Sequence, residues 1–356
     1  MRISLCQVAV LGTLAAAGCS GLSSPSDIVT TTSASAQQTA AEWRLSLLGD
    51  SRPTISGGGM ARTWMSAEAK STEGSIYVTG LYDGCIEIYP LRGHHQSQKG
   101  EICGSPLGFA VGLAVDRHRN LWVGDVANNQ ILRYRPGATT PSKVLTDSGY
   151  FPEGIAVDTK GTLYVANSAE STSGTSTVAI YAKGSRNHPQ LLSDPQMTGQ
   201  LGGVAIDQAR DIFVSFDFPH VVKLGEFTRS PSGSYTFSII ATPGGVPTGL
   251  QMDSSGNLLA ANQDAYTSTG HQTVSVFSSP SWSMTNSFGG AYAGNRLALN
   301  EKNNRVFVTE TFSQGSQSGS VVEFSYPAGK KINEIYPPAP ESPIGIAISP
   351  ASVTGS

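Results

Sequence analysis

Residues 151–181 read FPEGIAVDTKGTLYVANSAESTSGTSTVAIY, and this stretch decides the fold. It predicts an apolar strand that ends at Asp158, a turn at Lys160-Gly161, and two more strands over Leu163–Asn167 and Val178–Tyr181. The same pattern recurs along the chain. We therefore expect one structural unit that is repeated many times.

The apolar first strand of this unit occurs six times, and its copies lie 42 to 49 residues apart. That period is typical of propeller blades, each built from four short strands. The strands are followed by a polar residue at the turn, namely Asp116, Asp158, Asp207, Asp253, Asn300 and Ser349. We interpret these six side chains as turn caps, because Asp, Asn and Ser accept hydrogen bonds from nearby backbone amides.

A second strand recurs six times as well, from Ile76–Val78 to Val306–Val308. The chain is thus predicted to be all-β, a six-bladed β-propeller with four-stranded antiparallel blades over residues 60–350. The first strands are almost continuously apolar, as expected of innermost strands with blades on both sides. Either Ser342–Pro350 or Thr63–Ser66 supplies the missing inner strand of the first blade, and we favour the C-terminal segment.

The units Gly154-Ile-Ala-Val-Asp158 and Leu163-Tyr-Val-Ala-Asn167 resemble the NHL-repeat propellers and the related senescence-marker-protein/gluconolactonase superfamily. The resemblance covers roughly residues 60–350 and implies a six-bladed β-propeller. It does not choose an activity, because propellers of this kind include lactonases, lyases and pure binding proteins.

The first 18 residues predict a lipoprotein signal peptide. Arg2 gives a positive start, and the apolar stretch over residues 3–17 is shorter than the ~20 residues of a membrane-spanning helix. Ala17-Gly18-Cys19 resembles the bacterial lipoprotein signal, which implies a lipidated Cys19 at the start of the mature chain. An ordinary secretory signal is the alternative. We expect a lipid-anchored protein of the bacterial cell envelope that faces the periplasm or the surface.

Residues 19–59 are rich in Ser, Thr, Ala and Gln, a composition typical of a flexible tether. The propeller at 60–350 is followed by a short tail at 351–356. The formal net charge is -3, without blocks of like charge. This charge distribution gives no sign of a nucleic-acid partner.

Cys85 and Cys103 are the cysteines left in the predicted fold once the signal peptide is set aside. They lie on two segments that flank a polar loop, so a hairpin would bring the thiols together. An exported compartment allows a disulfide to persist. We favour the bridge over two free buried thiols.

The first and second strands of a blade run antiparallel. The start of each first strand and the end of each second strand therefore lie at the same opening of the ring, which we call the mouth face. Six polar residues are predicted there: Asp125, Glu153, Asn167, Asn262, Asn295 and Glu310. Carboxylate and amide oxygens suit a hard divalent cation such as Ca²⁺. The gluconolactonase resemblance implies an axial metal, with Glu153, Asn167 and Asn262 as its best matches. Turn-forming residues without a metal are the alternative, because Asn and Asp often end strands.

Two functions follow from this sequence. The first is a non-enzymatic binding or scaffold module that holds a protein, peptide or glycan through the mouth face, where long Ser/Thr/Gly-rich loops are expected. The second is a metal-dependent hydrolase of the lactonase type acting at the axis. Catalytic residues are not identified by the sequence.

Overall fold

The computed structural model describes residues 63–66, 69, 74–80, 84–92, 97–147, 150–169, 175–184, 188–216, 222–243, 246–263, 272–290, 294–300, 302, 304–310, 319–338 and 342–350. The predicted signal peptide, Cys19, the tether and the tail lie outside these residues. Among the described residues, no helix has the length and apolar character needed to span a membrane.

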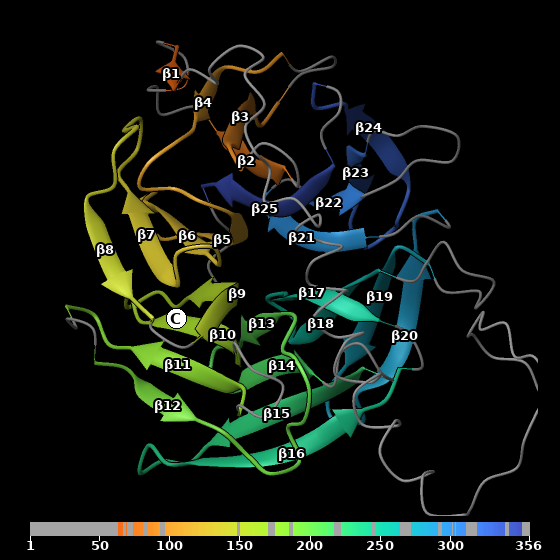
Figure 1. Ribbon diagram of the computed structural model, residues 1–356. Coiled ribbons are helices and arrows are strands. Elements are labelled where there is room, and N and C mark those ends of the chain that lie inside the picture. Colours follow the sequence, from red (N-terminus) through yellow and green to blue (C-terminus); the bar gives the residue numbers. More distant parts are fainter. Residues whose placement is uncertain are drawn as a thin grey trace, which may run out of the picture.

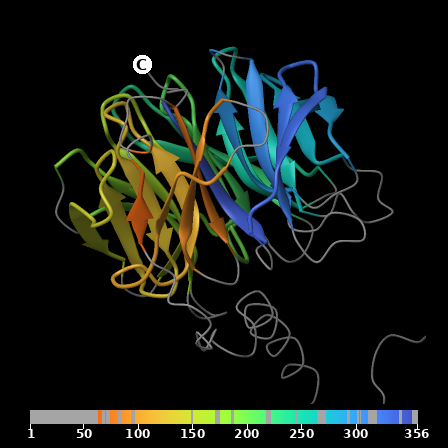
Figure 2. The same ribbon diagram turned by 90° about the horizontal axis from the view of Figure 1, so that it is seen from above.

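The described strands form six sheets arranged around one axis, each with its first strand innermost (Figure 1). Five sheets have four strands, and the sixth has a fifth strand at its outer edge. In the view turned by 90° the strands run across the thickness of the ring (Figure 2). The predicted six-bladed, all-β propeller is confirmed.

The blades are numbered in chain order, and their strands are given from the axis outwards. Blade 1 contains β25 (Pro343–Ser349), β2 (Ser75–Gly80), β3 (Ile86–Pro90), β4 (Gly100–Ile102) and β1 (Trp64–Met65). Blade 2 contains β5 (Ala110–Val115), β6 (Leu121–Asp125), β7 (Gln130–Tyr134) and β8 (Lys143–Thr146). Blade 3 contains β9 (Tyr150–Val157), β10 (Leu163–Ala169), β11 (Thr177–Tyr181) and β12 (Gln190–Leu192).

Blade 4 contains β13 (Val204–Ile206), β14 (Ile212–Phe216), β15 (Lys223–Arg229) and β16 (Tyr235–Ala241). Blade 5 contains β17 (Pro247–Met252), β18 (Asn257–Asn262), β19 (Val274–Ser278) and β20 (Ser283–Phe288). Blade 6 contains β21 (Gly294–Asn300), β22 (Arg305–Glu310), β23 (Ser320–Ser325) and β24 (Lys331–Ile335).

The C-terminal strand closes the ring. β25 pairs antiparallel with β2, with Ile346 opposite Val78, and so becomes the inner strand of blade 1. β1, which lies within the alternative segment Thr63–Ser66, instead pairs with β4 at the outer edge of the same blade. The favoured prediction is confirmed and the alternative is wrong, because the last part of the chain reaches the axis beside β2.

The hydrophobic core is divided among the interfaces between neighbouring blades. Trp122 and Ile131 of blade 2, for example, share a buried cluster with Leu163 and Tyr181 of blade 3. Each blade is apolar on both faces, so no blade can bury its own surface alone. The large aromatic residues at the ends of the third strands are explained by this packing.

The turn-cap prediction covers six residues after the first strands, and it is confirmed at the four Asp positions. Asp116 Oδ1 accepts hydrogen bonds from the amides of His118 and Asn120 at 2.8 and 2.9 Å. Asp253 Oδ1 accepts from the Asn257 amide at 2.7 Å, and Asp158 and Asp207 make the corresponding bond in their own turns. These carboxylates hold the fold and are not gathered at the axis.

The predicted disulfide is also confirmed. Cys85 and Cys103 are bonded, with an S–S distance of 2.06 Å. They directly flank the paired strands β3 and β4, in which Ile86 lies opposite Ile102. The bond therefore continues the hairpin ladder of blade 1.

Candidate functional site

The six polar residues predicted for the mouth face all lie at that end of their strands. Asp125, Asn262 and Glu310 are the last residues of β6, β18 and β22, and Asn167 lies near the end of β10. Glu153 and Asn295 lie near the starts of first strands. The face is as expected, but the side chains do not converge on one point.

Asp125 and Asn262 bind within their own blades. The Asp125 carboxylate accepts hydrogen bonds from the amides of Gly108 and Phe109, both at 2.9 Å. Asn262 Nδ2 donates to the Gln272 carbonyl at 2.7 Å and to Ser275 Oγ at 2.9 Å. Each side chain fixes the local backbone on the mouth face.

Asn167 lies between blades 2 and 3. Its side chain is fully buried and makes no hydrogen bond of standard geometry with the described residues. It faces Asp147, whose pKa is raised by burial and lowered in part by Tyr181 and Asn167. Tyr181 Oη donates to Asp147 Oδ1 at 3.1 Å. Asn167 thus belongs to a buried polar group at a blade interface.

Glu310 lies in the interface between blades 5 and 6. It is 2% exposed, and Thr273 Oγ1 of blade 5 donates to its Oε1 at 3.4 Å. Burial, together with the nearby Glu334 carboxylate, raises the pKa of Glu310 to about 7. This carboxyl group therefore titrates near neutral pH.

The residue at the centre of the mouth face is Arg296, at the start of β21. Its Nη1 donates to the carbonyls of Thr248 at 2.7 Å and Asn295 at 3.2 Å. Its Nη2 donates to the carbonyls of Gly202 at 3.2 Å and Glu153 at 3.3 Å. Four carbonyls from blades 3, 4, 5 and 6 therefore converge on one guanidinium.

The Arg296 side chain is partly buried. Burial lowers the pKa of Arg296, while the Glu153 carboxylate raises it in part. Arg296 Nε is buried and has no hydrogen-bond partner among the described residues. The two terminal nitrogens of the arginine therefore donate to the ring of carbonyls, and its Nε has no acceptor among the described residues.

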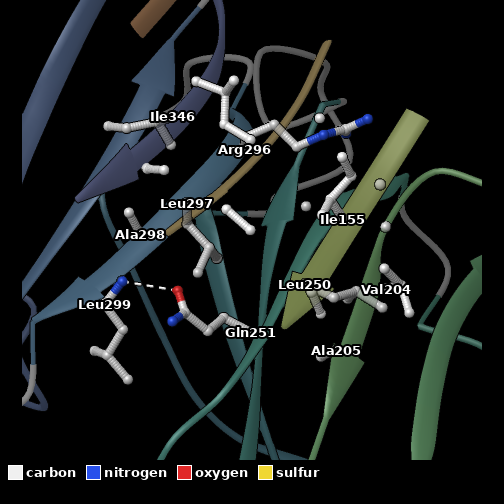
Figure 3. A pocket seen from close by; sticks show the side chains of 18 of the residues that line it. Ile155, Val204, Ala205, Leu250, Gln251, Arg296, Leu297, Ala298, Leu299 and Ile346 are labelled. Atoms are coloured by element: carbon white, nitrogen blue, oxygen red, sulfur yellow. Dashed lines mark hydrogen bonds between the residues drawn. The ribbon is translucent and has the colours of Figure 1, made fainter. Parts of the chain in front are cut away.

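A channel of about 110 Å³ runs along the axis next to Arg296, between the inner strands of the six blades. Figure 3 shows the Arg296 side chain extending across the channel towards Ile155, with Leu250 and Leu297 on its walls. Gln251 also reaches into the channel, where its Oε1 accepts a hydrogen bond from the Leu299 amide at 2.8 Å (Figure 3). Phe216 ends β14 at the mouth face, where a large side chain could block the channel. It does not line the channel, because it is buried between blades 3 and 4.

The Arg296 guanidinium places a positive charge beside the backbone carbonyls of the axis. The inward carbonyl oxygens already accept hydrogen bonds from a positive guanidinium, which would repel a second cation nearby. Among the described residues, the one group of three His, Cys, Asp or Glu with ligand atoms within 4.8 Å of one another is Cys85, Glu101 and Cys103. Both of its sulfurs are in the disulfide. The Ca²⁺ site at Glu153, Asn167 and Asn262 stays a prediction, and chelation tests it.

Sequence reasoning missed Arg296, although the repeat carries a signal. The first strands begin with Gly112, Gly154, Gly203, Gly249 and Gly345 in the other five blades, and with Arg296 in blade 6. A Cβ at Gly249 would lie 2.7 Å from Arg296 Cα, which shows how closely the inner strands approach. A large side chain at the start of a strand so near the axis has to cross the opening.

No protein-family model matches this chain, and no curated protein matches it. Similarity appears among solved structures. A chain of the nidogen/laminin complex covers 78% of this chain and 98% of its own, with a TM-score of 0.63 and 17% identity. A protein of unknown function from Bacteroides caccae covers the same shares, with a TM-score of 0.55 and 11% identity.

Identities this low establish the fold and nothing finer. The resemblance to NHL-repeat and gluconolactonase-like proteins is not tested by these two structures. The six sheets make this chain a six-bladed β-propeller that is closed by its own C-terminal strand, and the similarity to solved structures supports the propeller fold.

Proposed function

We propose that this chain is an envelope-anchored, NHL-like β-propeller lipoprotein that acts as a binding or scaffold module through its mouth face. The observation that carries the proposal is the Arg296 guanidinium, which takes up the axial carbonyls that a catalytic metal would otherwise approach. With the chain's own cation bound to the carbonyls at the axis, the exposed rim of the mouth face is the surface that we assign to a partner.

A protein or peptide partner suits this rim better than an ion. The segments between β10 and β11, β18 and β19, and β22 and β23 begin and end on the mouth face. They include the polar loops that the sequence assigns to ligand binding, most of whose residues lie outside the described ones. Rigid scaffolds commonly carry their binding residues on such connections. The nidogen/laminin structure is a propeller neighbour taken from a protein complex, which is consistent with a protein ligand.

The test compares substitutions on opposite faces of the ring. Ala127 and Tyr336 are exposed on the mouth face, and Lys160 and Lys183 are exposed on the far face. The full chain is cross-linked in cell envelopes and its bound proteins are quantified. Ala127→Arg with Tyr336→Asp is expected to remove the retained partner, whereas Lys160→Glu with Lys183→Glu is expected to keep it. Equal retention by both pairs would contradict binding through the mouth face.

The metal-dependent lactonase is the alternative, and one assay separates it from the binding module. The full chain is incubated with lactones and a series of divalent metals, with and without a chelator. The binding proposal expects no turnover under any of these conditions. Lactone hydrolysis that is lost on chelation and in Glu153→Gln would overturn it in favour of the enzyme.

A further inference from the structure

The interface between blades 2 and 3, which lie side by side in the ring (Figure 1), contains a group of buried polar atoms. Asn167 is fully buried, and Asp147 and Thr177 are each 5% exposed. Four atoms of these side chains make no hydrogen bond of standard geometry with the described residues: Asp147 Oδ2, Asn167 Oδ1, Asn167 Nδ2 and Thr177 Oγ1. They are half of the eight buried side-chain atoms of this kind in the described part of the chain. Buried polar groups normally have partners, so this concentration indicates an occupant that is not protein.

The three side chains face the same interface. β10 and β11 pair antiparallel with Asn167 opposite Thr177, which brings the two Cβ atoms within about 5.5 Å. Leu163 and Tyr181 lie at alternate positions on the same two strands and pack against blade 2. Asn167 and Thr177 therefore face blade 2 as well. Asp147 directly follows β8 of blade 2, and it is near enough to Asn167 for the amide to lower its pKa in part.

The chemistry of this group is that of oxygen atoms and one negative charge. Asp147 supplies a carboxylate oxygen, Asn167 an amide oxygen and Thr177 a hydroxyl oxygen. The other carboxylate oxygen, Asp147 Oδ1, accepts a hydrogen bond from Tyr181 Oη at 3.1 Å. Among the described residues, no lysine, arginine or histidine forms an ion pair with Asp147. A buried carboxylate without a counter-charge is unfavourable, and oxygen ligands of these types suit a hard cation.

We propose that the interface between blades 2 and 3 binds one sodium ion through Asp147 Oδ2, Asn167 Oδ1 and Thr177 Oγ1. A single carboxylate matches a monovalent charge, whereas Ca²⁺ sites commonly gather several carboxylates. The ion joins the end of β8 to the paired strands β10 and β11, and so holds two neighbouring blades together. The site is separate from partner binding and from the predicted axial Ca²⁺, although it uses Asn167.

Thermal unfolding of the full chain tests the site, with sodium chloride replaced stepwise by N-methylglucamine chloride at constant ionic strength. A chelator that carries no sodium is present, so that a divalent ion at the axis has no influence. The melting temperature is expected to rise saturably with sodium, by about 2–4 °C, and sodium NMR relaxation should report one bound ion per chain. Asp147→Asn is expected to abolish the rise, and Thr177→Val is expected to weaken sodium binding about 10-fold. Thr236→Val, on the exposed part of β16, is the matched control and should keep the wild-type response.

Several outcomes would overturn the proposal. A melting temperature that is the same in the two salts would leave an ordered water as the occupant. A sodium response that persists in Asp147→Asn would place the ion elsewhere, and a larger response to Ca²⁺ in chelator-free buffer would overturn the assignment to a monovalent ion. Thr177→Val decides the matter even where Asp147→Asn fails to fold, because it keeps the carboxylate and removes only the hydroxyl. Wild-type sodium affinity in Thr177→Val would contradict the site.

Discussion

Arg296 joins blades that are far apart in the sequence. Its bonds to the carbonyls of Glu153 and Gly202 span 143 and 94 residues. Replacing it by Met keeps much of the apolar stem but leaves these carbonyls and that of Thr248 without their donor. Buried groups that lose a partner cost about 1–3 kcal/mol each, so Arg296→Met is expected to lower the free energy of unfolding by about 3 kcal/mol or more.

Urea unfolding checks this prediction, with Arg133→Met as the matched control. Arg133 also loses a charge and a hydrogen bond, to Ser142 at 3.1 Å, but it lies on β7 away from the axis. The control is expected to change stability by about 1 kcal/mol or less, because Arg133 is half-buried and its guanidinium lies over the Trp122 ring. Equal losses of unfolding free energy in the two variants would show that Arg296 does not hold the blades together at the axis.

The raised pKa of Glu310 predicts that the free energy of unfolding depends on pH. Its folded pKa of about 7 lies above the ordinary value of 4.5, so the folded state holds a proton that the unfolded state releases. Stability must therefore fall as the pH rises from about 4.5 to 7, by about 3 kcal/mol at most. Glu310→Gln, which resembles the protonated form, is expected to remove this slope and to be more stable than the wild type at pH 8.

Denaturant unfolding between pH 4.5 and 8 measures the slope. Glu323→Gln is the control, because Glu323 lies in the same blade but forms an ion pair with Arg305 at 3.1 Å. It is expected to keep the wild-type dependence on pH over this range. A slope that survives in Glu310→Gln would assign the proton to another group.

Residue positions on the mouth face could be predicted from the repeat, but side-chain directions could not. The ends of β10 and β18 lie one strand away from the axis, so Asn167 faces the neighbouring blade and Asn262 faces its own. The backbone carbonyls at the starts of the first strands are what border the opening, and every residue type has such a carbonyl. The direction in which these carbonyls point depends on the strand register, and the carbonyls that Arg296 contacts depend on how the ring closes.

At the scale of elements, the inner and second strands were predictable because each carries its own apolar run. The outermost strands were fainter for a physical reason. β20 is exposed along nearly all of its length, so no apolar alternation marks its start at Ser283. β1 is shorter still and adds a fifth strand to blade 1 that the repeat does not contain.

The closing strand β25 should be a point of weakness for the whole ring. Ile346 is 3% exposed and packs in the cluster between blades 6 and 1. Ile346→Ala is expected to lower the free energy of unfolding by about 2–5 kcal/mol, the usual result of opening a core cavity. Val144→Ala, on the outer strand β8 where Val144 is 46% exposed, is the control and should cost under about 1 kcal/mol.

The disulfide supports the same blade from its outer side. It closes a separation of 18 residues between Cys85 and Cys103. Constraint of an unfolded loop of this length stabilises by about 3 kcal/mol. Cys85→Ser with Cys103→Ser is expected to lose that amount in urea unfolding, and a reducing agent should then have no further effect. A double variant as stable as the wild type would show that strand pairing alone holds blade 1.

At the scale of the whole molecule, we propose that the propeller binds a partner and that the N-terminal segment anchors it. The ring is closed by pairing between β2 and β25, both within the described residues. The proposed location in the envelope can therefore be tested without disturbing the fold.

If Cys19 carries the lipid, Cys19→Ala should move the protein from the membrane fraction to the soluble fraction, while the folded propeller keeps its melting temperature. Stable attachment requires more than one acyl chain, and a lipidated N-terminal cysteine supplies them. Incorporation of labelled palmitate measures the modification directly and should disappear in the variant. Cys6→Ala is the control, because Cys6 lies within the predicted signal peptide and should be absent from the mature chain. A Cys19→Ala protein that stays in the membrane fraction would mean that the propeller is held there by its partner instead of by a lipid.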